Sequence, residues 1–104
     1  MDGQMKRGLL DTCVLASLKN GESYGYQIVK DLSPCVSISE STLYPILRRL
    51  EAAGHVSVRS TEHNGRLRKY YKITKLGLNK IEGFIKEWKE IHQIYKYITQ
   101  GDLF

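Results

Sequence analysis

Cysteine and proline are scarce in this sequence, with two of each, and there is one tryptophan. Cys13 and Cys35 form no CxxC pair, and two cysteines are too few for a disulfide framework. One lies in a helical apolar pattern and the other follows a proline. We therefore expect two free thiols, buried or half-buried, in a cytoplasmic protein, with a disulfide between them as the alternative.

Long hydrophobic runs are also missing. No apolar stretch approaches the roughly 18 residues that a membrane-spanning helix needs. The apolar stretch near the N-terminus is interrupted by Asp11, which favours a core helix over a secretory signal. The sequence therefore predicts neither a membrane segment nor a leader.

No catalytic or metal-binding pattern is recognisable in the sequence. His55, His63 and His92 lie far apart and lack metal-ligand spacing. No Ser/His/Asp set, Cys/His set, pair of acids or phosphate-binding loop stands out. We therefore expect no enzymatic activity, no metal ion and no cofactor.

Positive charge is in excess, since 16 lysines and arginines against 11 acids give +5 and a pI near 9.3. This balance favours a polyanionic partner, with nucleic acid first and an anionic membrane surface second. The 104 residues predict one domain with an appended helix, and a chain this short gains from oligomerisation.

Three helices are predicted in the first half of the chain. Apolar spacing indicates a helix over 5–19, and a second helix over 24–32 with Ser23 as its cap. The third covers 39–53, capped by Ser39, or by Ser37 with Glu40 as a capping box. Its buried face is expected to carry four aliphatic residues, Leu43, Ile46, Leu47 and Leu50.

A β-hairpin and a long helix follow. Residues 55–59 alternate as a half-buried strand does, and Asn64-Gly65 is a strong hairpin turn signal. In the second strand Leu67, Tyr71 and Ile73 share one face. The long helix runs from 75 to about 100, so we divide the chain into a domain of three helices and a hairpin, 1–74, and a C-terminal helix with its tail, 75–104.

The long helix carries an apolar seam with spacings of 3, 4, 3, 4 and 3 residues. Such a heptad seam packs against a second helix, so we predict a homodimer. The seam consists of Ile81, Phe84, Trp88, Ile91, Tyr95 and Ile98.

The order helix, helix, helix, hairpin predicts a mainly α (α+β) winged helix-turn-helix with a two-stranded wing. In this arrangement the third helix enters the major groove of double-stranded DNA and the wing follows the backbone. Between residues 59 and 72 five basic residues and one acidic residue, Glu62, give +4. The expected DNA-binding residues are Ser39, Ser41, Thr42, Tyr44, Pro45, Arg48, Arg49, Arg66, Arg68 and Lys69.

Three stretches, "YGYQIVKDL", "STLYPILRRLEAAGHV" and "GRLRKYYKITKLG", resemble the PadR-like transcriptional regulators over residues 6–78. Ser41 stands where that family usually has glycine. The resemblance implies a dimeric winged-helix repressor that often responds to phenolic or other aromatic compounds. The single C-terminal helix is similar to that of the small subfamily that includes the lactococcal multidrug-resistance regulator.

Trp88 lies in the middle of the seam, in an "EWKEI" setting similar to that subfamily, whose paired tryptophans flank a flat pore. A bulky indole near a two-fold axis could sandwich a planar aromatic effector, with Phe84, Ile91 and Tyr95 around it. The alternative is a closed interface, in a regulator that another protein controls. A second alternative is a winged helix used for protein assembly.

Overall fold

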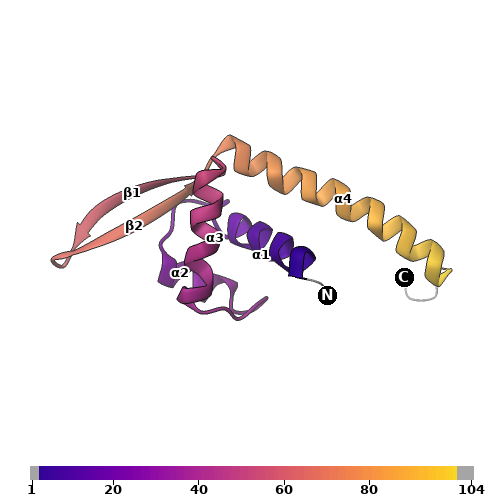
Figure 1. Cartoon of the computed structure of the whole chain (residues 1–104), viewed down its shortest axis with the longest axis horizontal. Coiled ribbons are helices and arrows are strands. Elements are labelled where there is room, and N and C mark those ends of the chain that lie inside the picture. The colour runs from indigo at the N-terminus through magenta and orange to yellow at the C-terminus, as the bar shows by residue number, and fades with distance from the viewer. Residues whose placement is uncertain (1–2, 101–104) are drawn as a thin grey trace.

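The computed structural model describes residues 3–100, and its elements follow the predicted order (Figure 1). Three helices are followed by an antiparallel hairpin and a long helix, which is the winged-helix arrangement with an added C-terminal helix. The elements are α1 (Gly3–Ser17), α2 (Gly25–Leu32), α3 (Glu40–Ala52), β1 (Val56–His63), β2 (Arg66–Ile73) and α4 (Lys75–Thr99).

The core lies where α1, α2 and α3 meet, with the base of the hairpin and the start of α4 closing it. The four aliphatic residues predicted for the inner face of α3 are all buried. They pack in one cluster with Val14 and Leu15 of α1, Leu18 in the turn after α1, and Ile28 of α2. Burying apolar area of this kind is the main term that stabilises the arrangement.

The predicted cap of α2 is wrong. The helix begins at Gly25, and Ser23 pairs instead with Tyr71 of β2. Its N–H donates to the Tyr71 carbonyl at 3.0 Å, and the Tyr71 N–H donates back at 2.8 Å. Tyr24 therefore occupies the N-cap position, and the buried Ser23 hydroxyl makes no hydrogen bond to the helix.

Helix α3 begins as predicted. Ser39 is its N-cap and accepts a hydrogen bond from the Thr42 N–H at 3.2 Å, so the Ser37 alternative is wrong. Pro45 lies in the second turn, where it removes the bond that residue 45 would donate to the Ser41 carbonyl. The lost hydrogen bond lies near the start of the helix, so the backbone hydrogen bonds of the later turns are not affected.

The hairpin pairs Val56 with Ile73 at its base and His63 with Arg66 at its tip. Asn64 and Gly65 both have positive φ, as a tight turn of this kind requires. In Figure 1 the hairpin extends well beyond the helices. Leu67 and Tyr71, predicted to share one face of the second strand, both line the same groove. Leu67 near the tip is 81% exposed, whereas Tyr71 at the base is buried.

Helix α4 is fixed at its N-terminal end and extends away from the helical body on the side opposite the hairpin (Figure 1). Thr74 accepts from the Gly77 N–H at 3.2 Å and donates to the Gly54 carbonyl at 2.6 Å. Ile81, predicted to lie in the dimer seam, is only 6% exposed and packs in the chain's own core. None of the described helices is long and apolar enough to cross a membrane.

Both cysteines are free thiols, as predicted. Cys13 is half-buried against the core, but Cys35 is exposed, so the prediction of its burial is wrong. Cys35 lies in the turn between α2 and α3, where no apolar neighbour is required.

Candidate nucleic-acid interface

The start of α3 presents a cluster of three hydroxyl groups. Ser39 Oγ lies 2.9 Å from Ser41 Oγ and donates to Thr42 Oγ1 at 3.1 Å. All three side chains are exposed. The free N–H groups and the helix dipole favour an anion at this end, so the cluster is suited to bind phosphate oxygens.

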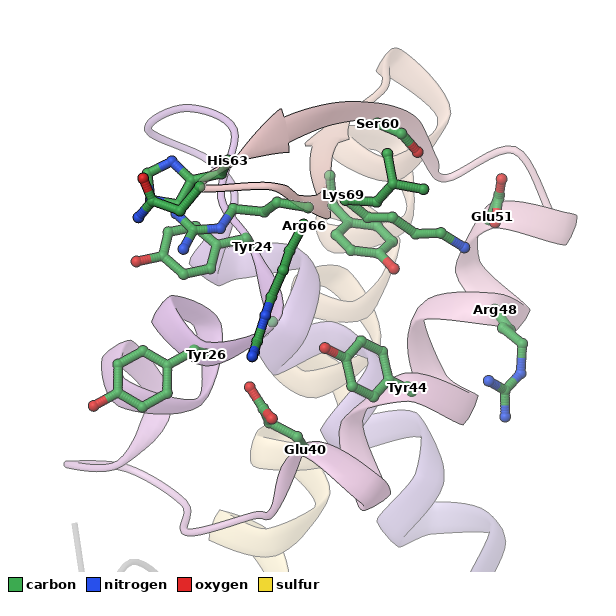
Figure 2. A pocket seen from close by; sticks show the side chains of 15 residues that line it. Tyr24, Tyr26, Glu40, Tyr44, Arg48, Glu51, Ser60, His63, Arg66 and Lys69 are labelled. Carbon is green, nitrogen blue, oxygen red and sulfur yellow. The ribbon is translucent and has the colours of Figure 1, made fainter.

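Tyr44 lies one turn further along and crosses to α2. A Cβ added to Gly25 would lie 2.7 Å from the Tyr44 hydroxyl and 3.1 Å from the ring carbon that carries it. Glycine at 25 is therefore what allows the tyrosine ring to lie against α2. The hydroxyl stays accessible, because Tyr44 lines an open groove (Figure 2).

The two arginines of α3 point to different surroundings. Arg48 is exposed and lines the groove. The Arg49 side chain instead donates to Asp11 of α1 at 2.7 Å. The structure thus brings Arg48 to the other predicted DNA-binding residues and directs Arg49 to a link between two helices.

The groove lies between α2, α3 and the hairpin and encloses about 890 Å³ (Figure 2). It is lined by Arg66, Arg68 and Lys69 of β2 and by Tyr44 and Arg48 of α3. In Figure 2 the Arg66 side chain extends from the hairpin toward Glu40. Cations of two elements therefore line one concave surface.

Two carboxylates and a buried phenol also belong to this groove. Glu40 and Glu51 line it at either end of α3. The pKa of Tyr71 is raised, first by burial and then by the nearby Tyr44 and Glu51, while Arg48 opposes the shift. Tyr71 is therefore a neutral donor at physiological pH.

Sequence reasoning missed several residues of the groove. Tyr24, Tyr26 and Glu40 line it although none was predicted to bind DNA. Tyr24 carries the Arg68 guanidinium 4.2 Å above its ring centre. Tyr24 and Arg68 lie in separate segments of the chain, and no local sequence pattern indicates that their side chains are in contact.

The predicted effector residues gather on the outer half of α4. Trp88, Ile91 and Tyr95, with His92, line a small apolar cavity of about 250 Å³. Phe84 stacks on Trp88 with centroids 6.2 Å apart and planes 11° apart. The indole is 52% exposed, so much of its surface is available for another contact.

Comparison with known proteins gives one consistent result. The model of the transcriptional regulator PadR-like family matches residues 14–83. The structure of a transcriptional regulator from Clostridium thermocellum is 31% identical, with a TM-score of 0.80 over 91% of this chain and 97% of that one. A PadR-like transcriptional regulator from Bacillus cereus is 30% identical, with a TM-score of 0.77 over 96% and 100%.

One further structure, Bacillus subtilis PadR, was solved in complex with operator DNA. It is 26% identical, with a TM-score of 0.69, and the match covers 74% of this chain and 46% of that one.

Proposed function

This chain belongs to the PadR-like family of transcriptional regulators, and from that premise we propose that it is a homodimeric, sequence-specific DNA-binding repressor. The observation that carries the proposal is the groove between α3 and the hairpin, where cations of both elements face one surface. A PadR bound to operator DNA shares the fold, which supports double-stranded DNA as the polyanion.

The proposed contacts combine the residues predicted from the sequence with the groove that several of them line. Ser39, Ser41 and Thr42 bind phosphate at the start of α3, while Tyr44, Pro45 and Arg48 face the major groove. Arg66, Arg68 and Lys69 follow the backbone as the wing. Arg49 reaches DNA only if it leaves Asp11.

We assign dimerisation to the outer part of α4. Apart from Ile81, which the core of one chain occupies, the predicted seam residues are exposed or half-buried in a single chain. An exposed apolar stripe of this kind marks an interface. The proposed boundary between the DNA-binding domain, 1–74, and the dimerisation segment, 75–104, coincides with the Thr74 cap.

The salt dependence of DNA binding tests the proposal. We expect affinity for duplex DNA to fall steeply with salt, and Lys69→Ala to lower the slope of log K against log salt by about 1. The loss should be similar on operator and random sequences, because a phosphate contact carries no sequence information. Binding that is weak and insensitive to salt would favour the protein-assembly alternative.

The cavity beside Trp88 supports a second role, release from DNA by a planar hydrophobic effector. A flat aromatic compound could stack on the exposed part of the indole, beside the cavity that Trp88 lines. We expect such dyes to quench Trp88 fluorescence at about one dye per dimer, and Trp88→Ala to abolish dye-induced release with DNA binding intact. If a broad panel of planar compounds neither quenches Trp88 fluorescence nor changes DNA affinity, the effector hypothesis fails, and a regulator controlled by another protein is favoured.

A further inference from the structure

Five side chains join the wing to the segment that leads into α2. We name this set the wing clamp; it consists of Glu22, Tyr24, Arg59, Arg68 and Tyr70. Arg59 Nε donates to Glu22 Oε2 at 3.0 Å, and its Nη2 donates to the other carboxylate oxygen. The Arg59 guanidinium also lies 4.6 Å from the Tyr70 ring centre.

Tyr24 continues the same series of contacts. Its ring meets Tyr70 edge-to-face, with centroids 5.8 Å apart and planes at 71°. Its own face carries the Arg68 guanidinium at 4.2 Å. One residue before α2 thus contacts two residues of β2 through its ring alone.

The backbone attachment beside this cluster is small. Residues 22–24 pair with β2 only through the bridge between Ser23 and Tyr71. A two-stranded hairpin is marginal by itself, so its orientation depends on what it packs against. Toward its tip the wing borders the open groove, which Tyr24 and Arg68 of the clamp also line. The clamp therefore supplies side-chain contacts that hold the wing against the segment before α2.

The clamp also contains two of the basic residues, Arg59 and Arg68, that give the hairpin its positive charge. Arg59 is paired with Glu22, and its hydrogen bonds lower the pKa of that carboxyl, so the pair stays ionised at neutral pH. Arg68 is stacked on Tyr24 at the edge of the groove. Both arginines have a protein partner before any ligand arrives.

We propose that the wing clamp holds the wing at a fixed angle to α3, and that Tyr24 is its central positioning residue. The inference rests on the proposed DNA-binding function and deepens it. A wing that is ordered before binding loses less conformational freedom when DNA arrives, and this preorganisation raises affinity. Tyr24 would act through Arg68 and Tyr70.

The charge at Glu22 gives a test in which two accounts predict opposite signs. By electrostatics alone, Glu22→Ala removes a negative charge near a polyanion and should strengthen DNA binding. If the clamp positions the wing, the same change frees Arg59 and should weaken binding about three- to tenfold, the scale of one or two exposed cation–π contacts. Glu62→Ala is the matched control, because it removes the same charge from β1 outside the clamp, and it should not weaken binding.

The ring at position 24 gives the second test. Tyr24→Leu should weaken DNA binding by a similar factor with the salt slope unchanged, since no phosphate contact is lost. Tyr24→Phe keeps the ring and should retain affinity. Amide hydrogen exchange without DNA should accelerate in β1 and β2 of the Leu variant and not in α3, whereas Tyr26→Leu should leave wing exchange unchanged.

These outcomes separate the two proposals. If the unaltered protein binds no duplex, the DNA-binding function fails, and hydrogen exchange in the wing still decides the clamp. If Tyr24→Leu leaves wing exchange and DNA affinity unchanged, or if Glu22→Ala strengthens binding as Glu62→Ala does, the clamp is overturned. If Tyr24→Leu does not fold, the effect of Glu22→Ala on DNA affinity decides, because Glu22 is exposed and its substitution does not disturb the core.

Discussion

At the scale of single residues, α3 shows how two adjacent arginines acquire different roles. Both lie on the polar side of the helix, but Arg49 has a partner in α1 and Arg48 faces the groove. Arg48→Ala should lower affinity for the operator by about 1–3 kcal/mol if the side chain reads a base. Titration of operator and random duplexes measures this, and equal losses on both would demote Arg48 to a backbone contact.

Arg49→Ala is the matched change on the same helix. It should leave DNA affinity nearly unaltered and lower the free energy of unfolding by at most about 1 kcal/mol, since the Asp11 pair is partly exposed. Urea titration measures the stability loss. A larger effect of Arg49→Ala than of Arg48→Ala on operator affinity would exchange the two assignments.

The two cysteines should differ in reactivity. Burial raises the pKa of the Cys13 thiol, and the neighbouring Cys35 thiol raises it further, whereas Cys35 is exposed. Since the thiolate is the nucleophile, iodoacetamide at pH 8 should modify Cys35 first, and the Cys13 reaction should accelerate as the pH rises. Mass spectrometry of the native protein resolves the two sites. A fast reaction that persists in Cys35→Ser would contradict this ranking.

At the scale of elements, two glycines of α4 invite opposite predictions for one substitution. A Cβ on Gly77 would overlap the His55 carbonyl, while a Cβ on Gly83 would meet nothing within 4 Å. Gly77→Ala should therefore destabilise the fold by about 1–3 kcal/mol through overpacking. Gly83→Ala should stabilise it by up to about 1 kcal/mol through helix propensity. Thermal unfolding of both variants tests the pair, and a stabilising Gly77→Ala would refute the close packing.

Local patterns were sufficient to predict most elements but not their neighbours. Periodicity, Ser39 and Asn64-Gly65 specify helices, cap and turn, because each signal lies within a few residues of the feature it creates. Ser23 was assigned wrongly because its partner, Tyr71, lies in the wing. Strand alternation places Leu67 on the face of Tyr71, but it does not indicate that Leu67 lies beyond the helices and is exposed.

The candidate site was only partly predictable, because local patterns do not indicate contacts between separate elements. The composition of α3 and of the wing identifies Arg48, Arg66 and Lys69, whose surface positions follow from periodicity. The pairing of Arg49 with Asp11 and the stacking of Arg68 on Tyr24 are contacts between separate elements. Such contacts depend on how the elements pack, which no local pattern specifies.

At the scale of the whole molecule, the wing and the outer part of α4 extend to opposite sides of one helical body (Figure 1). If α4 joins two chains, Ile91→Lys should dissociate the dimer, because it places a charge in the apolar stripe. Gln93→Lys is the control, since it introduces the same charge at an exposed position outside the seam. Sedimentation equilibrium measures both variants, and a dimer that survives Ile91→Lys would move the interface elsewhere.

The most direct test of the central claim is selection of bound sequences from a pool of random duplex DNA. A symmetric dimer presents two α3 helices to one face of the duplex. We expect enrichment of an inverted repeat whose half-sites lie about 10 bp apart, or a multiple of that distance. A pool that shows no enrichment, or that yields a single asymmetric half-site of full affinity, would contradict a dimeric sequence-specific DNA-binding protein.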